Sequence, residues 1–314
     1  MPINDLKNLF EQTLNHTPLS VNELSASGSN RRYFRMQGKA ISVIGAYNKD
    51  LRENEAFLGF TKHFLSKGVN VPDIIAEDLS RNIYILSDLG DETLYSYRCK
   101  FNEFTPELIQ IYKDVLKNLL FLQTEGGKEL NYSLAYPRAA FDHQSISWDL
   151  NYFKYYFLKL ADIPFDEQLL ENDFTTFTKF LLEADANFFL FRDFQSRNIM
   201  LHQNKLFFID YQGGRKGALP YDVASLLYDG KAAIPPSVRT ELLEYYIEEM
   251  NATNSWNPDL FRKYYYAFVF VRIMQAMGSY GYRGFYERKE HFLQSIPFAL
   301  KNLKWLLENI NLPI

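Results

Sequence analysis

The chain has 314 residues, of which 47% are apolar and 23% charged, so it has enough apolar material for more than one compact unit. Its net charge of −4 provides no basic stripe for a phosphodiester backbone, which argues against nucleic acid as a partner. The single cysteine, Cys99, excludes an internal disulfide and the sequence contains no run of 18 apolar residues, so we expect a cytoplasmic protein without a membrane partner.

The first third of the chain predicts a small mixed unit. Residues 3–15 form an amphipathic helix with acids and amides on one side, which is unlike a secretion signal. A second helix is expected over 50–67, where Phe57, Phe60 and Phe64 repeat at helical spacing. Strands bounded by glycine, asparagine and serine are expected around this helix, at 20–25, 32–37, 40–46 and 82–87.

The pattern changes near residues 87–92, where a short hinge is expected, and the rest of the chain predicts a mostly helical unit. Thr105-Pro106-Glu107 is a typical helix start, and apolar residues mark one helix face from there to Gly126. Further helices are expected at about 147–160, 166–184, 222–230, 237–251, 258–280 and 288–309. We find no internal repeat, so we predict one α+β protein with two domains, 1–90 and 91–314.

The segment Phe191–Gln212, FRDFQSRNIMLHQNKLFFIDYQ, has the strongest chemical pattern of the chain. Ile199–Leu201 and Leu206–Ile209 predict the two strands of a tight hairpin. Strand pairing would bring Asn198 and Asp210 together at the open end, with side chains roughly 5 Å apart. An amide oxygen and a carboxylate at this separation suit Mg²⁺, which prefers oxygen ligands and keeps further sites for water and phosphate.

Asp193 lies five residues before Asn198, after a run of strand-forming residues at 187–191. Because it is close to the predicted metal pair, Asp193 is the carboxylate expected to receive a proton from an attacking hydroxyl. The segment therefore predicts metal-assisted phosphoryl transfer. The alternative is that Asp193 and Asn198 only form Asx turns and that Asp210 only ends a strand.

This segment resembles the catalytic core of the aminoglycoside phosphotransferase superfamily, whose fold is similar to that of protein kinases. RDFQSRNIM, followed by IDYQGGRKGALPYDVASLLYD, most resembles the branch that contains the bacterial N-acetylmuramate/N-acetylglucosamine anomeric kinases. The resemblance extends upstream to SGSNRRYFR (27–35) and downstream to RIMQAMGSYGYR (272–283). It implies two lobes, an N-terminal lobe with a small antiparallel sheet that binds nucleotide and a mostly helical C-terminal lobe with the catalytic and substrate-binding residues.

The resemblance also implies where ATP binds. A loop near the N-terminus would lay backbone N–H groups and cations over the phosphates, and a plain hairpin turn is the alternative there. This loop and the residues after it are Ser27, Gly28, Ser29, Asn30, Arg31 and Arg32. Backbone groups of the hinge, around Ser87 and Leu89, would hold the adenine.

The strand AISVIGAY, residues 40–47, departs from the family pattern. Kinases place a lysine there, paired with a helix glutamate that would be Glu53 in this chain, with Glu55 as the alternative. Either another cation replaces this lysine, or metal and backbone groups hold the nucleotide. The candidate cations are Arg31, Arg32, Lys39 and Lys49.

Other residues are assigned by the same resemblance. Asp222 is implied to brace the catalytic loop, and as a carboxylate in a first helical turn it would also favour the helix dipole. Arg192 and Arg197 either add positive charge near the reaction or anchor the loop. Asp149 is implied to hydrogen-bond sugar hydroxyls, and Arg272 to reach an acidic or acetylated group of the substrate.

These observations together predict an ATP- and Mg²⁺-dependent kinase whose acceptor is a small molecule with a hydroxyl group. The acceptor we expect is the anomeric hydroxyl of an amino sugar. A kinase of another small molecule, such as an aminoglycoside, choline or homoserine, is an alternative, because a fold does not fix its acceptor. A protein kinase and a nucleotide-binding pseudokinase module are further alternatives, the second prompted by the missing strand lysine.

Overall fold

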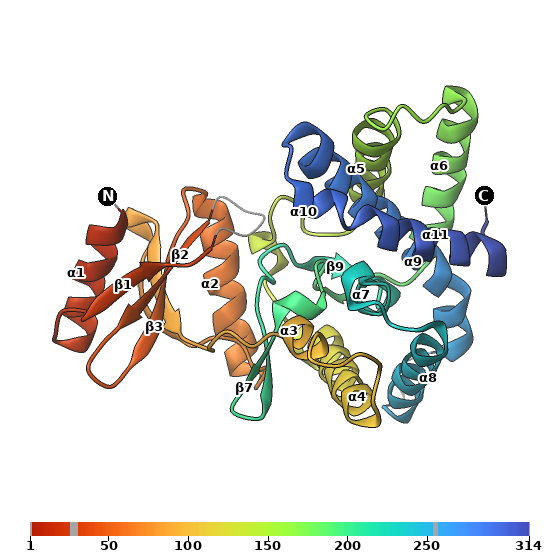
Figure 1. The fold of residues 1–314 in the computed structure, drawn as a ribbon. Helices are drawn as coiled ribbons and strands as arrows, with labels where there is room; N and C mark the ends of the chain where they lie inside the picture. Colours follow the sequence, from red (N-terminus) through yellow and green to blue (C-terminus); the bar gives the residue numbers. More distant parts are fainter. Residues whose placement is uncertain (1, 26–30, 254–256, 314) are drawn as a thin grey trace. The chain divides into compact units, whose positions relative to one another are not determined.

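The structure is a computed structural model that describes residues 2–25, 31–253 and 257–313 (Figure 1). The chain divides into two compact units. Unit 1 comprises residues 1–94, 129–139 and 197–214, and unit 2 comprises 95–128, 140–196 and 215–314. Both units are discontinuous in sequence, whereas the predicted domains 1–90 and 91–314 are continuous, and the functions assigned to those domains stay predictions.

Unit 1 is built on a five-stranded antiparallel sheet with the strand order β1-β2-β3-β5-β4. Its strands are β1 (Ser20–Glu23), β2 (Arg32–Gln37), β3 (Ser42–Tyr47), β4 (Ile74–Asp78) and β5 (Ile83–Ser87). The sequence predicted four of these strands and missed β4. Its sequence, IIAED, ends in two acids and has no alternation of apolar and polar residues, so it carries no strand signal.

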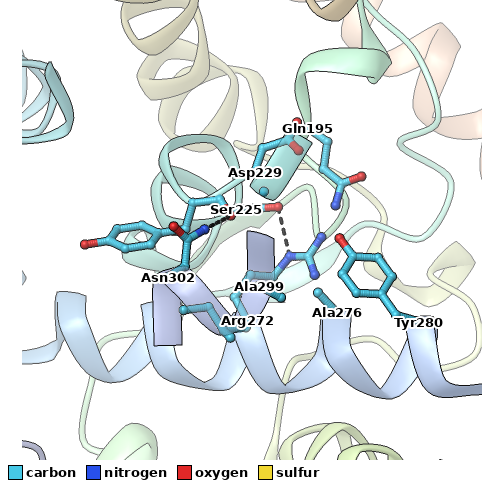
Figure 2. A pocket seen from close by; sticks show the side chains of 11 residues that line it. Gln195, Ser225, Asp229, Arg272, Ala276, Tyr280, Ala299 and Asn302 are labelled. Carbon is cyan, nitrogen blue, oxygen red and sulfur yellow. Dashed lines mark hydrogen bonds between the residues drawn. The ribbon is translucent and has the colours of Figure 1, made fainter. Parts of the chain in front are cut away.

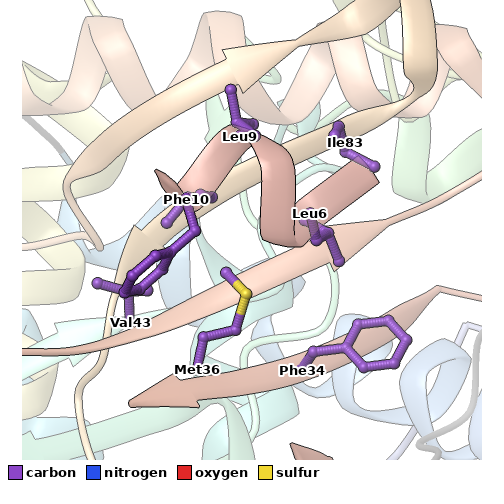
Figure 3. Close-up of a cluster of buried hydrophobic side chains, with 8 residues drawn as sticks. Leu6, Leu9, Phe10, Phe34, Met36, Val43 and Ile83 are labelled. Carbon is purple, nitrogen blue, oxygen red and sulfur yellow. The ribbon is translucent and has the colours of Figure 1, made fainter. Parts of the chain in front are cut away.

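Helix α1 (Pro2–Leu14) packs against the sheet of unit 1 and forms a buried apolar cluster with it (Figure 3). The helix contributes Leu6, Leu9 and Phe10, and β2 contributes Phe34 and Met36, two residues apart on the same face of the strand. Glycine on the neighbouring strand allows this close approach, because a Cβ atom at position 45 would lie 2.9 Å from a methyl group of the helix. The cluster fixes β2 in the sheet.

Helix α2 (Leu51–Ser66) begins at Asp50, whose side chain accepts a hydrogen bond from the backbone N–H of Glu53. Unit 1 also contains the predicted hairpin, as β7 (Ile199–His202) and β8 (Lys205–Phe208). The two turn residues between these strands both have positive φ, as the tight hairpin turns that match strand twist require. The hairpin prediction is therefore confirmed.

Unit 2 is mostly helical, with two short strands. Its helices are α3 (Leu94–Arg98), α4 (Pro106–Phe121), α5 (His143–Phe153), α6 (Glu167–Leu182), α7 (Pro220–Leu227), α8 (Pro236–Ala252), α9 (Pro258–Gly281), α10 (Glu290–Leu293) and α11 (Ile296–Asn309). The strands β6 (Phe188–Leu190) and β9 (Arg215–Gly217) pair with each other. None of the described helices is long and apolar enough to cross a membrane.

Helix α9 is buried along most of its length and packs against α5, α7 and α11. Its contact with α5 is close, because a Cβ atom at Gly278 would lie 2.8 Å from the backbone carbonyl carbon of Tyr152. The helix predicted over 288–309 is instead two helices, α10 and α11. Pro297 stands in the first turn of α11, where it lacks the N–H that a continuous helix would need.

Candidate active site

The loop after β6 carries the predicted catalytic residue Asp193. Two buried aromatic side chains anchor this loop, Phe191 and Phe194, whose rings meet edge to face with centroids 5.1 Å apart. Between them Arg192 has φ +79°, in the left-handed region that few residues other than glycine adopt. The loop leaves the Asp193 side chain 43% exposed.

Asp222, in the first turn of α7, lies beneath the start of this loop. Its carboxylate accepts hydrogen bonds from the backbone N–H groups of Phe191, at 2.7 Å, and Arg192, at 2.9 Å. The side-chain amide of Gln123 donates a third, at 3.1 Å. Complete burial raises the pKa of Asp222 to about 7, against the lowering effect of these three donors. The contacts that the resemblance implied are present, and their effect on catalysis stays a prediction.

Arg272, on α9, is the cation beside Asp193. Its Nη2 lies 3.6 Å from Oδ1 of Asp193, and its side chain is only 6% exposed. The guanidinium is held in place by two further contacts, since Nε donates to Ser225 Oγ at 2.9 Å and Nη1 donates to Gln275 Oε1. A fixed, desolvated cation next to this half-exposed carboxylate restrains the direction in which the Asp193 side chain points.

Asp149, on α5, is buried and does not lie on an open surface. Its Oδ1 accepts a hydrogen bond from Arg192 at 3.0 Å. Burial raises the pKa of Asp149, although Arg192 favours the ionised form. Arg215, on β9, is buried near the same charges, and burial together with the charge of Arg192 lowers its pKa to about 10. Arg215 was not predicted as a site residue, because nothing in the sequence GGRKG indicates that its arginine is buried.

Asn198 and Asp210 lie together at the open end of the β7–β8 hairpin in unit 1. The backbone N–H of Ile209 donates to the Asn198 carbonyl at 3.0 Å, which brings the two side chains side by side. Asn198 Nδ2 lies 3.4 Å from Asp210 Oδ2. Gln212 donates to the other carboxylate oxygen of Asp210, at 2.7 Å. The predicted juxtaposition is therefore observed, and its role in metal binding stays a prediction.

The chain after Asp210 is fixed to α2 by Tyr211. The hydroxyl of Tyr211 lies 2.6 Å from that of Thr61, and its ring stacks on Phe57 with centroids 5.3 Å apart. Asp210 itself has φ +72°, a conformation that asparagine and aspartate tolerate better than most residues. A residue keeps such an unfavourable backbone conformation only when its surroundings restrain it, and the buried Tyr211 restrains Asp210 in this way.

Helix α2 also positions Glu53, which pairs with Arg31. The Arg31 Nη2 and Glu53 Oε1 atoms are 3.1 Å apart, and the arginine side chain is 1% exposed. The guanidinium also lies over the ring of Phe57, at 5.6 Å from its centroid, and donates to the hydroxyl of Tyr33. Arg31 is therefore a desolvated cation paired with a glutamate of α2, and the role of this pair in nucleotide binding stays a prediction.

The other three candidate cations have different surroundings. Arg32 forms a two-pronged pair with Glu23, at 2.7 and 2.8 Å, on the surface of the sheet. Lys39 and Lys49 are exposed. Of the four candidates, Arg31 alone is both buried and paired with the predicted glutamate.

The remaining predicted site residues are dispersed. Ser27, Gly28, Ser29 and Asn30 lie outside the described residues. Arg197 is exposed. Ser87 ends β5, where its hydroxyl accepts from the backbone N–H of Asp73 at 2.9 Å, and Leu89 is buried. The nucleotide contacts assigned to these residues stay predictions.

Comparison with known proteins decides the family. The profile of the phosphotransferase enzyme family matches residues 20–257, which is more than half of the chain. The chain belongs to this family. It is therefore a phosphotransferase that uses a hydroxyl group as acceptor, as the sequence predicted.

Relatives support this assignment. The chain is 23% identical over 313 residues to an N-acetylmuramate/N-acetylglucosamine kinase of Neisseria meningitidis serogroup B, covering 95% of this chain and 89% of that protein. It is 26% identical over 235 residues to the kinase of the same name from Pseudomonas aeruginosa, covering 73% of this chain and 66% of that protein.

Solved structures share the fold. Choline kinase from Cryptosporidium parvum superposes with a TM-score of 0.64 at 14% identity, covering 98% of this chain and 96% of that chain. Aminoglycoside phosphotransferase APH(2'')-Ib with ADP bound gives 0.63 at 16% identity, covering 94% of this chain and 97% of that chain. The predicted α+β, protein-kinase-like fold is confirmed.

Proposed function

We propose that this family member is an ATP-dependent kinase that phosphorylates the anomeric hydroxyl of an amino sugar. The observation that carries the proposal is that the chain has curated relatives in three bacteria that are each named N-acetylmuramate/N-acetylglucosamine kinase. Asp193, Asn198 and Asp210, which the sequence pattern assigns to catalysis and metal binding, support it. Aminoglycoside phosphotransferases of this fold have been solved with ADP and with ATP and streptomycin, which supports nucleotide use.

Mg²⁺ fits the hairpin pair of unit 1. Asn198 and Asp210 offer an amide oxygen and a carboxylate from adjacent positions, and Mg²⁺ in kinases is commonly held by one or two such groups together with waters and phosphate oxygens. When bound, the ion would neutralise charge on the phosphates. Gln212 donates to Oδ1 of Asp210 and the Asn198 amide nitrogen lies 3.4 Å from Oδ2, so an ion bound by this pair would replace the contact between Asn198 and Asp210.

Arg31 is proposed to act in place of the missing strand lysine. Its pairing with Glu53 fixes the guanidinium, and a fixed cation loses little freedom when it binds a phosphate. Arginine differs from lysine because its planar fork can contact glutamate and a phosphate oxygen at the same time. If Arg31 binds the nucleotide, the contact between protein and phosphate lies at the start of β2. The lysine of other kinases stands on the neighbouring strand, β3.

Asp193 is proposed to orient the acceptor hydroxyl and to take its proton. The hydroxyl oxygen forms a bond to the γ-phosphorus, the bond from that phosphorus to the β–γ bridging oxygen breaks, and ADP leaves. Arg272 orients Asp193, and Asp222 holds the backbone on which Asp193 stands. Catalysis in this scheme is chiefly positioning and charge neutralisation.

ADP release in the presence of Mg-ATP and a panel of acceptors tests the proposal. The panel comprises N-acetylglucosamine, N-acetylmuramate, glucose, choline, homoserine and an aminoglycoside. Turnover with the two acetylated sugars is expected, and Asp210→Asn is expected to weaken Mg-nucleotide binding together with turnover. Turnover with choline, homoserine or an aminoglycoside alone would contradict the acceptor assignment.

A second candidate is a nucleotide-binding module without turnover, because β3 carries no lysine. It predicts that Mg-ATP raises the midpoint of thermal unfolding while no acceptor releases ADP. The retention of Asp193 beside a fixed Arg272 argues against it, since a module that only binds nucleotide needs no oriented base.

A further inference from the structure

The loop that carries Asp193 is held at both of its ends, and the two ends are held in different ways. At its start, the rings of Phe191 and Phe194 pack together, and the Asp222 carboxylate accepts the first two backbone N–H groups of the loop. At its end stands Ser196, which is fully buried. Asp193 lies between these ends, so its position depends on both.

Asp229 holds the end of the loop through a single oxygen atom. Its Oδ2 accepts the backbone N–H of Ser196 at 3.2 Å and the Ser196 hydroxyl at 2.6 Å. A distance of 2.6 Å from hydroxyl to carboxylate is typical of a charge-assisted hydrogen bond, which is about twice as strong as a bond between neutral groups. Because Ser196 is removed from water, the loss of Asp229 would leave two buried donors unsatisfied.

Packing contributes less at this end of the loop, because a small cavity lies beside it (Figure 2). The cavity has a volume of about 20 Å³, which is room for about one water molecule, and both Gln195 and Asp229 line it. Its other walls come from α7, α9 and α11. Atoms that face a cavity lack packing contacts on that side, so the hydrogen bonds to Asp229 carry more of the restraint here.

A tight turn couples the end of the loop to Asp193. The backbone N–H of Gln195 donates to the carbonyl of Asp193 at 2.9 Å, which closes a three-residue turn. Ser196 follows this turn directly. A displacement of Ser196 would therefore move the backbone from which the Asp193 side chain projects.

Helix α7 links this end of the loop to the other supports of Asp193. Asp222 and Ser225 stand three residues apart on α7 and therefore lie on the same face of the helix. Ser225 accepts the hydrogen bond from Nε of Arg272, the arginine beside Asp193 (Figure 2). Asp229 follows two residues after the end of the helix. One short helix and the residue just beyond it thus hold the start of the loop, its end and the cation beside the proposed base.

We propose that Asp229 is a positioning residue for Asp193, which holds the end of the loop as Asp222 holds its start. The inference rests on the proposed function, in which Asp193 takes the proton of the acceptor, and deepens it. Asp229 acts through the backbone of Ser196 and not by contact with the acceptor. Displacing a reacting group by about 1 Å can cost on the order of 10²-fold in rate, so the anchor affects turnover more than binding.

The test measures kcat and the KM for ATP in the full chain, with Mg-ATP and N-acetylglucosamine. Asp229→Ala removes both hydrogen bonds and is expected to lower kcat about tenfold while the KM for ATP stays constant. Asp229→Asn is the conservative variant. Because both donors of Ser196 reach the same oxygen, an amide oxygen in its place can accept both, and most of the kcat should remain. Asp173→Ala, at an exposed aspartate of α6, is the matched control and should be fully active.

A double-mutant cycle on kcat shows whether Asp229 acts through Asp193. Asp229→Ala should lower kcat when Asp193 is intact and should have no further effect on the slow turnover left in Asp193→Asn. A general structural defect would lower both rates by the same factor, and that result would overturn the proposal. An Asp229→Ala variant with the kcat of the unmodified chain, or an Asp229→Asn variant as impaired as Asp229→Ala, would overturn it too.

Amide hydrogen exchange separates this inference from the proposed function, because it requires no turnover. Exchange at Gln195 and Ser196 should be faster in Asp229→Ala than in the unmodified chain, and Asp229→Asn should keep most of the protection. Unchanged exchange in Asp229→Ala would overturn the anchor even in an active kinase, whereas an unmodified chain that turned over no sugar would overturn the proposed function. Should Asp229→Ala fail to fold, Ser196→Ala, which removes only a hydroxyl, is expected to lower kcat less than tenfold, and an unchanged kcat would count against the anchor.

Discussion

Breaking the Arg31–Glu53 pair should weaken both unit 1 and its binding of ATP. The Arg31 side chain is 1% exposed and that of Glu53 is 26% exposed, with 3.1 Å between Nη2 and Oε1. At this distance two unit charges attract by about 5 kcal/mol at an effective dielectric constant of roughly 20. Glu53 keeps contact with water, however, and measured hydrogen bonds to charged groups contribute about 1.5–3 kcal/mol. We therefore expect a coupling energy of about 2 kcal/mol.

A double-mutant cycle measures this coupling. Arg31→Met, Glu53→Gln and the double variant are unfolded in urea, and the coupling energy is the difference between the double variant's destabilisation and the sum of the single ones. The KM for ATP is measured on the same proteins. We expect it to rise about tenfold in Arg31→Met, which corresponds to the loss of one phosphate contact of about 1.4 kcal/mol, and less in Arg31→Lys.

The neighbouring arginine provides the control. Arg32 pairs with Glu23 at the surface, so Arg32→Met should change neither the urea midpoint nor the KM for ATP measurably. A coupling energy below about 0.5 kcal/mol in the Arg31–Glu53 cycle would refute the structural part of the reasoning. A KM for ATP that is the same in Arg31→Met and Arg32→Met would refute its functional part.

Two further predictions concern the catalytic loop. Burial raises the pKa of Asp222 to about 7 from its ordinary value of 3.8, so the folded chain binds this proton more tightly than the unfolded chain. The contribution of Asp222 to the free energy of unfolding therefore falls as the pH rises from about 4 to about 7. Asp222→Asn should remove this fall in urea titrations across that range, and an unchanged slope would contradict the raised pKa. Arg272→Met should lower kcat about tenfold, with Arg272→Lys between it and the unmodified chain, while the KM for ATP stays constant. If Arg272→Met weakened ATP binding as much as it lowered kcat, the loss would reflect a general structural defect and not the contact with Asp193.

Local patterns in the sequence predicted the elements whose signal is periodic. The aromatic spacing in α2 is visible along the chain, and both α2 and α9 are found near the expected bounds. The closeness of Asn198 and Asp210 was also predictable, because the two-residue hairpin turn fixes a register in which Asn198 lies opposite Ile209, the residue before Asp210. Strand β4 was missed because its partners in the sheet, and not its own sequence, make it a strand.

Contacts between distant segments were not predictable. Arg272 was expected to reach the substrate, and the structure places it against Asp193 because α9 passes behind the catalytic loop. Arg31 was one of four candidate cations, and only the burial of its side chain beside α2 distinguishes it. Asp149 was expected near sugar hydroxyls, and its observed partner is Arg192. Each of these contacts depends on how helices and loops pack, which residue spacing does not encode.

The most direct test of the central claim is the turnover of Asp193→Asn with Mg-ATP and N-acetylglucosamine, with the phosphorylated product identified by phosphorus NMR. If Asp193 takes the proton of the acceptor hydroxyl, the variant should lose at least about 10²-fold in kcat while its affinity for ATP changes little. Asp173→Asn, at an exposed aspartate of α6, serves as the control and should retain full activity. An Asp193→Asn protein that forms sugar 1-phosphate at a rate close to that of the unmodified chain would contradict the account.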